Sequence, residues 1–262
     1  MSRPSRHRAE RAVAPVAGLL VFFGLWEGLV RLLGVKPFVM PGPWRILRTL
    51  ADAPGFFWHE GMVTAREAAT GLAIALALAL VAAVPMARRR SVERAGQPVA
   101  LFVQVIPLVC YAPAFVIWMG PGFRPIAAVS ALVCFVPLLY NLTAGLRAAD
   151  PDARDLLHSA GASRFEILRH VEIPSALPHL FAGLRTSVGL ALIGAVLSEW
   201  FALVSHGLGR QIQKGMAGAS APLVWGCAFA LGALGSASLA LLALLERLLV
   251  PGARPERAGR LD

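Results

Sequence analysis

The stretch DPDARDLLHSAGASRFEILRHVEIPSALP, residues 150–178, is a charged island between long apolar runs of a 262-residue chain. Asp150 is a favoured N-cap, and Pro151 suits the first helical position, where no N–H is needed. Apolar side chains then recur at helical spacing, at Ala153, Leu156, Leu157 and Ala160. The pattern predicts a short amphipathic helix that does not cross a membrane.

The second half of the island carries the signals of a turn and a second helix. Gly161 stands where a left-handed residue closes a helix. Ser163, followed three positions later by Glu166, forms a capping-box pattern that predicts the next helix start. Pro174 is predicted to end that helix.

The composition indicates a membrane protein. The chain is 57% hydrophobic and 15% charged, whereas soluble domains are about 25% charged. A membrane-spanning helix needs about 20 mostly apolar residues. We therefore expect an all-α polytopic membrane protein with about six transmembrane helices, near residues 12–33, 64–87, 98–119, 125–146, 177–204 and 222–250.

Three regions are predicted along the chain. Residues 1–62 hold a basic tail, the first span and an external loop with a short helix. Residues 63–250 form a core of five spans that contains the 150–178 island, and residues 251–262 form a cytoplasmic tail. Within the core, residues 205–220 are predicted to be a turn-rich external loop.

The basic residues indicate the topology. Lys and Arg exceed Asp and Glu by 25 to 15, but they occur in short runs between apolar spans, which fits anionic lipid headgroups better than nucleic acid. Basic residues favour the cytoplasmic side. Most fall in four segments, at Arg3, Arg6, Arg8, Arg11, Arg88, Arg89, Arg90, Arg94, Arg147, Arg154, Arg164, Arg169, Arg247, Arg254, Arg257 and Arg260. This bias predicts that both termini and the island face the cytoplasm.

Residues within the predicted spans suggest a transport path. Pro107, Pro113 and Pro137 interrupt helical hydrogen bonding, and broken helices commonly surround such paths. Polar groups in spans are costly in lipid, so they are candidates to line it. The candidates are Gln104, Tyr111, Asn141, Ser198 and Glu199, with Tyr140 and Ser187 in addition. Glu199 has alternatives: it could pair with Arg185 or Arg66, or reach the outer interface.

Other residue types predict structure rather than chemistry. The three cysteines lie in apolar stretches without C-x-x-C spacing, so we expect packing roles. The histidines are scattered, and no metal or cofactor site is predicted. Small residues at helical spacing, Gly24 with Gly28 and Ala228 with Gly232, predict close helix contacts. Without a G-x-x-x-x-G-K-[ST] motif, the chain is not expected to hydrolyse ATP.

The island carries a family resemblance. The positions are Asp155, Gly161, Ala162, Ser163, Phe165, Ile173, Pro174, Ala176, Leu177, Pro178, Gly183, Leu184 and Arg185. This series resembles the EAA loop of permease subunits in ATP-binding-cassette importers, and its spacing is most similar to the nitrate, sulfonate and taurine class. Asp155, Leu156 and Leu157 replace the usual Glu-Ala-Ala, which makes the helix face bulkier.

The resemblance, over roughly residues 36–250, implies a permease subunit of the bacterial inner membrane. Such a subunit would form the path for a small polar or anionic solute, such as nitrate, a sulfonate, taurine or a thiamine pyrimidine precursor. It would work as a homodimer with cytoplasmic ATPase subunits and an external solute-binding protein. Residues at the family's coupling helix, which docks in a cleft of the ATPase, are Asp155, Leu156, Gly161, Ala162, Ser163 and Phe165.

Two other function classes remain at this point. A secondary transporter or other membrane carrier would need an internal repeat and ion-coupling carboxylates; the chain has no evident repeat, and Glu199 is its one candidate. An intramembrane enzyme would need a nucleophile with a base, or paired acids, and no G-x-S-x-G motif occurs.

Overall fold

The computed structural model describes residues 6–36 and 38–250, with side chains from residue 18 onward. Within these residues all regular structure is helical, which confirms the predicted all-α class. The helices are α1 (Arg6–Leu32), α2 (Pro43–Asp52), α3 (Pro54–Arg88), α4 (Arg90–Val105), α5 (Leu108–Met119), α6 (Phe123–Arg147), α7 (Pro151–Ser159), α8 (Arg164–Ile167), η1 (Leu168–Glu172), α9 (Ile173–Glu199), α10 (Leu208–Ala217) and α11 (Ala221–Leu249). The predicted tail at 251–262 lies outside the described residues.

Four straight helical segments are long and apolar enough to cross a membrane: α3, α6, the continuous Arg164–Glu199 segment, and α11. They correspond to the predicted second, fourth, fifth and sixth spans. The first predicted span lies in α1, where the side chains of residues 12–17 are outside the description.

The predicted third span is not a single straight helix. It divides into α4 and α5, which bend by 98° and together could make one further crossing. Pro107 caps the start of α5 and accounts for the break. Pro113 and Pro137, in contrast, lie inside α5 and α6 without dividing them. The expectation that all three prolines break helices was therefore correct only for Pro107.

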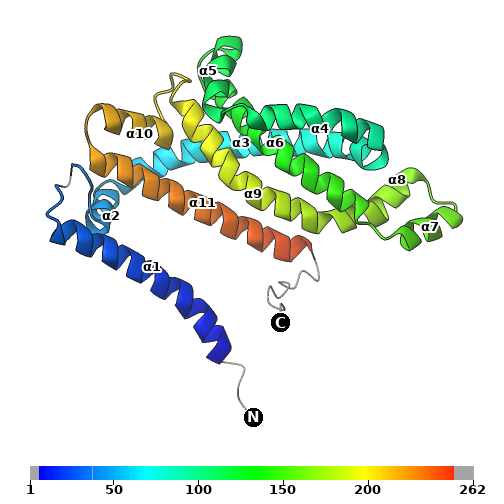
Figure 1. Ribbon diagram of the computed structural model, residues 1–262, viewed down its shortest axis with the longest axis horizontal. Coiled ribbons are helices and arrows are strands. Elements are labelled where there is room, and N and C mark those ends of the chain that lie inside the picture. The colour runs from blue at the N-terminus through cyan, green and yellow to red at the C-terminus, as the bar shows by residue number, and fades with distance from the viewer. Residues whose placement is uncertain (1–5, 37, 251–262) are drawn as a thin grey trace.

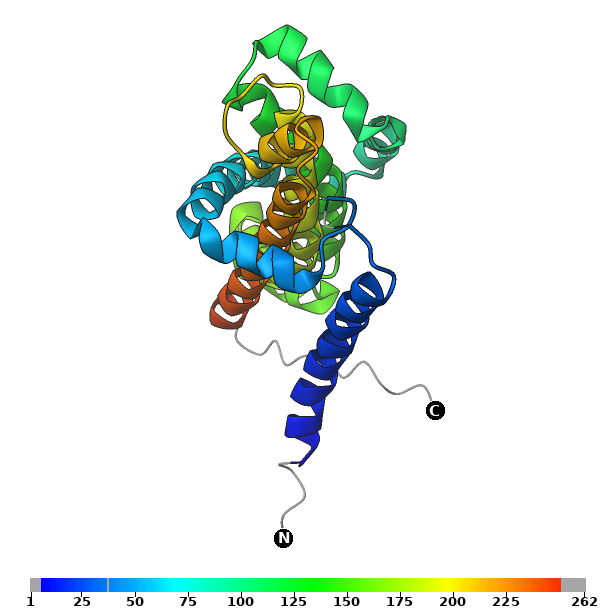
Figure 2. The same cartoon turned by 90° about the vertical axis from the view of Figure 1, so that its left-hand side faces the viewer.

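The bundle is built around α3, α6 and α9, which pack along their lengths with α11 beside them (Figure 1). The two ends of the bundle differ: α7 and α8 project at one end, and α10 and α2 lie at the other. We call these the α7 end and the α10 end. In both views α1 diverges from the bundle toward its N-terminus, whereas near its C-terminal end Trp26 packs against Trp225 of α11 (Figure 2).

Small residues let the three central helices approach closely. A Cβ at Gly71 of α3 would overlap Ser130 and lie 2.7 Å from the Ala127 carbonyl oxygen, both in α6. Near the same residue of α6, a Cβ at Gly194 of α9 would lie 3.0 Å from the Cα of Ser130. Helices in lipid associate mainly through such close packing, because lipid is as apolar as their own side chains.

The predicted contacts at Gly24, Gly28 and Gly232 were wrong, because a Cβ at any of these positions would meet open space. Spacing alone identified glycines on α1 and α11, but the helices that approach closely are α3, α6 and α9. A small-residue pair marks an interface only when its face is turned to another helix.

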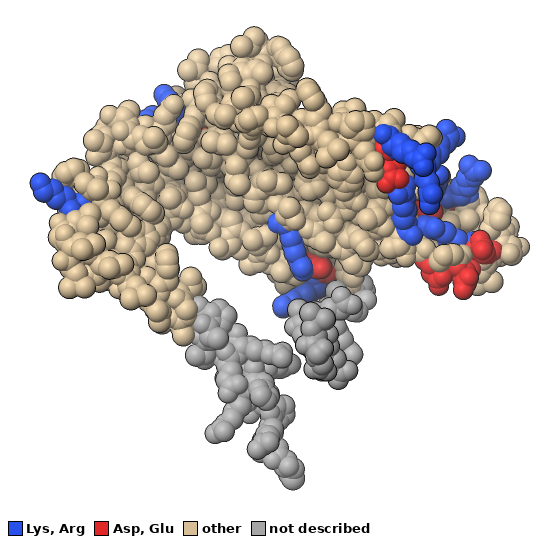
Figure 3. All heavy atoms as spheres, viewed as in Figure 1, with Lys and Arg blue, Asp and Glu red and all other residues tan. Residues whose placement is uncertain are grey.

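The surface agrees with a membrane location. Large apolar side chains are exposed along α11, among them Leu241, Leu244 and Leu248. Charged side chains, in contrast, gather at the α7 end on the face shown in Figure 3. Such an apolar exterior is stable in lipid, whereas the α7 end requires water.

A pair of glycines tests the packing of the bundle. We expect Gly71→Ala to destabilise the protein by about 1–3 kcal/mol, because the added methyl group meets the α6 backbone. Gly189→Ala is the matched control: a Cβ there meets open space, so the better helix propensity of alanine should leave stability equal or raise it by about 0.5–1 kcal/mol. The thermal unfolding midpoints in detergent measure both. Equal midpoints would contradict the packing described.

Candidate functional site

The 150–178 segment forms the turns and caps that its sequence predicts. The Asp150 side chain accepts a hydrogen bond from the Asp152 N–H at 3.0 Å and caps α7. Gly161 adopts a left-handed φ of 82°, and Ser163 and Glu166 form a complete capping box. Both short helices therefore begin as predicted, because each signal acts within a few residues.

The end of the second helix differs from the prediction. Pro174 does not end it: α8 passes through the π-helical turn η1 directly into α9, where Pro174 lies in the first turn. Pro174 cannot donate a hydrogen bond to the preceding turn, and that turn is the π-helical η1, where regular α-helical hydrogen bonding is already interrupted. Residues 164–199 thus form a continuous helical segment of 36 residues that joins the island to a membrane span.

The residues predicted to couple lie together on this projecting end. Leu156 of α7 is 72% exposed and Phe165 of α8 is 68% exposed, which is unusual for large apolar side chains on a charged surface. Asp155, Gly161 and Ser163 are also exposed, and Ala162 is half-buried. The arrangement offers a protein partner two apolar anchors within a polar rim.

Ion pairs and a hydrogen bond connect this segment to two spans, α3 and α6. Glu172 of η1 lies 3.7 Å from Arg88 at the end of α3 and 3.5 Å from Arg154 of α7. Arg154 also donates to the Leu146 carbonyl of α6 at 2.5 Å. Glu172 and Arg154 therefore connect α7 and η1 to the ends of α3 and α6.

A second set of polar contacts lies beside the contacts of Glu172 and Arg154. Arg147, at the end of α6, donates to both Glu93 oxygens at 2.9 and 2.8 Å, and to the Met86 carbonyl oxygen at 2.7 Å. This bidentate pair holds the start of α4 and the end of α3 against α6. Together the contacts of Glu172 and of Arg147 connect the helix ends and short helices at the α7 end of the bundle.

The α10 end contains a buried polar network that sequence reasoning missed. Glu60 and Thr64 of α3 and Glu199 of α9 are 3%, 0% and 0% exposed. The Thr64 hydroxyl donates to Glu199 Oε1 at 2.7 Å and accepts from the Leu208 N–H at 2.8 Å.

The two carboxylates complete the attachment of the segment before α10. Glu60 Oε2 accepts from the Gly207 N–H at 2.6 Å, and Glu199 Oε2 accepts from the Arg210 N–H at 3.0 Å. Side chains from α3 and α9 therefore satisfy backbone N–H groups at the start of α10. The available signal was the recurrence of Glu60, Thr64 and Glu67 at helical spacing on one face of α3.

Residues 205–220, predicted to be a turn-rich loop, contain the ten-residue helix α10. Leu208 and Ile212, one turn apart, pack in a small apolar cluster with Phe57 and Cys227. This long-range contact stabilises a helix whose two glycines and polar surface made it look like a loop.

The alternatives for Glu199 are resolved by its neighbours. Arg185 pairs with Glu246 of α11, and the Arg66 guanidinium lies 5.4 Å from the centre of the Phe123 ring. Glu199 is instead held inside the bundle by Thr64 and the Arg210 N–H. In this chain it connects helices rather than facing an open surface.

The other candidates for the path are not brought together. Gln104 is exposed on α4, and the Tyr111 hydroxyl of α5 donates to the Val103 carbonyl oxygen at 2.7 Å across the bend. Asn141 of α6 bonds its own helix at Pro137. Ser198 is fully buried. Their role in a path stays a prediction.

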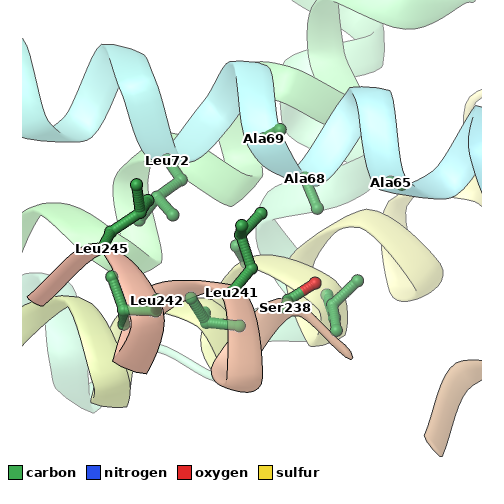
Figure 4. Close-up of a pocket in the computed structure, with 11 residues that line it drawn as sticks. Ala65, Ala68, Ala69, Leu72, Ser238, Leu241, Leu242 and Leu245 are labelled. Carbon is green, nitrogen blue, oxygen red and sulfur yellow. The ribbon is translucent and has the colours of Figure 1, made fainter. Parts of the chain in front are cut away.

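An apolar pocket lies between α3, α9 and α11 (Figure 4). Leu241, Leu242 and Leu245 of α11 lie opposite Ala68 and Leu72 of α3. This hydrocarbon lining suits lipid chains and offers few partners to a polar solute.

Two threonines on α3 test the buried network. We expect Thr64→Val to cost about 1–3 kcal/mol, because it keeps the shape but leaves the buried Leu208 N–H and Glu199 Oε1 without their partner. Thr70→Val is the matched control, since the Thr70 hydroxyl bonds only to the Arg66 carbonyl of its own helix. The difference in thermal unfolding midpoint in detergent measures the contribution of the network. A Thr64→Val protein as stable as Thr70→Val would contradict it.

Comparison with known proteins identifies the family. The family model described as "Binding-protein-dependent transport system inner membrane component" matches residues 75–255. The formylaminopyrimidine transport permease protein of Halalkalibacterium halodurans is 31% identical over 245 residues, covering 93% of this chain and 97% of the relative. The riboflavin transport system permease protein of Chloroflexus aurantiacus is 35% identical over 235 residues, covering 88% and 86%.

More distant relatives are also transporter proteins. The taurine transport system permease protein of Escherichia coli is 26% identical over 206 residues, covering 76% of this chain and 74% of the relative. The crystal structure of an amino acid ABC transporter with histidines shares the fold at a TM-score of 0.58 and 17% identity, covering 77% of this chain and 95% of the other. The chain therefore belongs to the family of binding-protein-dependent transport system inner membrane components, and it is a multi-pass translocation subunit of an ATP-binding-cassette importer.

Proposed function

We propose that this permease works as a homodimer, receives the ATPase at its α7 end, and carries a small nitrogen heterocycle. Membership of the family implies an ATPase and a substrate-binding protein as partners. The points proposed here are finer: where the ATPase docks, how many permease copies assemble, how the termini are oriented and which solute passes.

The observation that carries the docking proposal is the exposed pair Leu156 and Phe165 on a charged, capped projection. Truncation of a buried apolar anchor at the centre of an interface commonly costs 2 kcal/mol or more. The continuous helix through η1 into α9 and the Glu172 contacts provide rigid connections from this projection to the spans. Closure of the ATPase would then displace α6 and α9 together with α7, a differential contact between two states.

A homodimer and cytoplasmic termini are supported by less direct observations. The bundle packs tightly around α3, α6 and α9, so one copy does not surround a path, whereas two copies related by a two-fold axis could enclose one between them. The basic residues Arg88, Arg89 and Arg94 lie at or next to the α7 end, where Arg88 contacts Glu172. The positive-inside tendency then favours this end, and with it both termini, on the cytoplasmic side.

The solute proposal rests on the relatives. Two relatives that share more than 30% identity over most of the chain are named for formylaminopyrimidine and riboflavin, both nitrogen heterocycles. The relative named for taurine shares 26%. We therefore favour a pyrimidine-type heterocycle over nitrate or a sulfonate.

Substitutions at the α7 end test the docking. We expect Leu156→Asp and Phe165→Asp to weaken ATPase binding at least about tenfold, because each places a charge where the partner must bury an apolar side chain. Met216→Asp is the control: Met216 is 61% exposed, at the α10 end. Binding of the purified ATPase to permease in nanodiscs measures the effect. If the ATPase docked elsewhere, Leu156→Asp and Phe165→Asp would bind it no more weakly than Met216→Asp does.

Gly161→Val tests whether the turn transmits movement. The left-handed φ of Gly161 strains a β-branched residue. We expect ATP-driven uptake to fall severalfold while the thermal midpoint of the bundle stays within a few degrees. Unchanged uptake and ATPase binding would contradict the coupling role.

Uptake by the complete transporter identifies the solute. The permease is reconstituted in proteoliposomes with its partner ATPase and substrate-binding protein, and ATP-driven uptake of labelled formylaminopyrimidine, riboflavin, taurine and nitrate is measured. We expect a heterocycle to accumulate, and competition between the first two to rank them. Accumulation of taurine or nitrate alone would replace the heterocycle proposal and leave the docking proposal intact.

A further inference from the structure

Two histidines and a glutamate meet at the α10 end of the bundle. His59 and Glu60 are consecutive residues of α3, and His206 lies in the segment between α9 and α10, almost 150 positions away along the chain. The Nδ1 atoms of His59 and His206 lie 3.4 and 3.0 Å from the same oxygen, Glu60 Oε1. The centroids of the two imidazole rings are 5.0 Å apart, and the ring planes are inclined by 79°.

The spacing of these atoms matches a metal coordination shell. One ligand atom from each of the three residues lies within 4.8 Å of the others. Zinc binds imidazole nitrogen and carboxylate oxygen at about 2.0–2.2 Å, so neighbouring ligand atoms of a tetrahedral site are about 3.4 Å apart. The two nitrogen–oxygen distances are already close to this value. Small rotations of the imidazoles would admit an ion between the three atoms.

The surroundings resemble those of an open metal site. The Glu60 side chain is 4% exposed, and its second oxygen accepts the Gly207 N–H at 2.6 Å, which fixes the orientation of the carboxylate. The imidazoles of His59 and His206 are 60% and 58% exposed. One rigid, buried ligand with two accessible ones provides an entry route and leaves room for a water molecule as the fourth ligand.

We propose that His59, Glu60 and His206 bind a divalent first-row transition-metal ion, for which Zn²⁺ is the best fit. Two nitrogen donors with one carboxylate suit Zn²⁺ and its neighbours, whereas Ca²⁺ and Mg²⁺ prefer sets of oxygen ligands. The bound ion would join α3 to the segment before α10. This is the segment that Glu60, Thr64 and Glu199 already hold, so metal would stiffen the α10 end.

Binding of the metal to purified permease tests the site. The full-length permease in complex with its ATPase is prepared with a tag that lacks histidine, washed with a chelator and titrated with Zn²⁺ in a calorimeter without nucleotide. We expect one ion per permease chain and a higher thermal midpoint with Zn²⁺. His59→Ala and His206→Ala should each weaken binding at least tenfold and remove the thermal shift.

His170→Ala is the matched control, because His170 is an exposed histidine at the other end of the molecule, and it should leave Zn²⁺ binding unchanged. His206→Cys keeps a metal ligand; we expect it to retain binding and to give Co²⁺ an intense thiolate charge-transfer absorption. This variant decides the matter if the alanine variants are unstable. The proposal is overturned if the wild type shows no saturable binding, if all variants bind alike, or if the cysteine variant gives no such absorption.

Discussion

Close backbone approach between α3, α6 and α9 is the constraint on which the rest of the structure depends. In lipid, apolar side chains gain little by leaving one hydrocarbon surface for another, so helices are held by short-range packing and by polar contacts that have no alternative partner. Gly71 and Gly194 bring both neighbouring helices close to Ser130 of α6. That proximity sets the distances at both ends of the bundle. It brings Thr64 within reach of Glu199 at one end, and Glu172 within reach of Arg88 and Arg154 at the other.

The two ends use polar groups differently. At the α7 end the ion pairs are partly exposed, with side-chain exposures of 39% for Arg88 and 30% for Arg154, so each contributes little to stability. Their geometric effect is larger than their energy, because they direct any force on α7 into three helices. At the α10 end the carboxylates of Glu60 and Glu199 are buried, and their hydrogen bonds replace those that water would have made. One end is thus suited to transmit movement and the other to keep its shape.

How much the sequence could predict follows from the range of each interaction. The caps at Asp150 and Ser163 and the turn at Gly161 depend on neighbours within three residues, and all three were predicted. The spans followed from hydropathy, except that the 98° bend between α4 and α5 could not be located from the prolines alone: Pro107 lies at the break, whereas Pro113 and Pro137 lie in intact helices. The helix α10 and the network of Glu60, Thr64 and Glu199 could not be predicted, because the contacts that hold them include pairs 135 and 147 positions apart. The available signal in the sequence was the helical spacing of Glu60, Thr64 and Glu67 on one face of α3.

The buried network also constrains how the chain is made. Synthesis proceeds from the N-terminus, so α3 emerges with Glu60, Thr64 and Glu67 well before residues 199–210 exist. During that interval Glu60 and Thr64 lack the contacts that Gly207, Leu208 and Glu199 later provide, and exposing such polar groups to hydrocarbon is costly. It follows that α3 can settle to its final depth only once α9 and the start of α10 have been translated, and that a nascent chain truncated before residue 199 would hold this helix poorly. Assembly of the first core span thus waits for the last third of the chain.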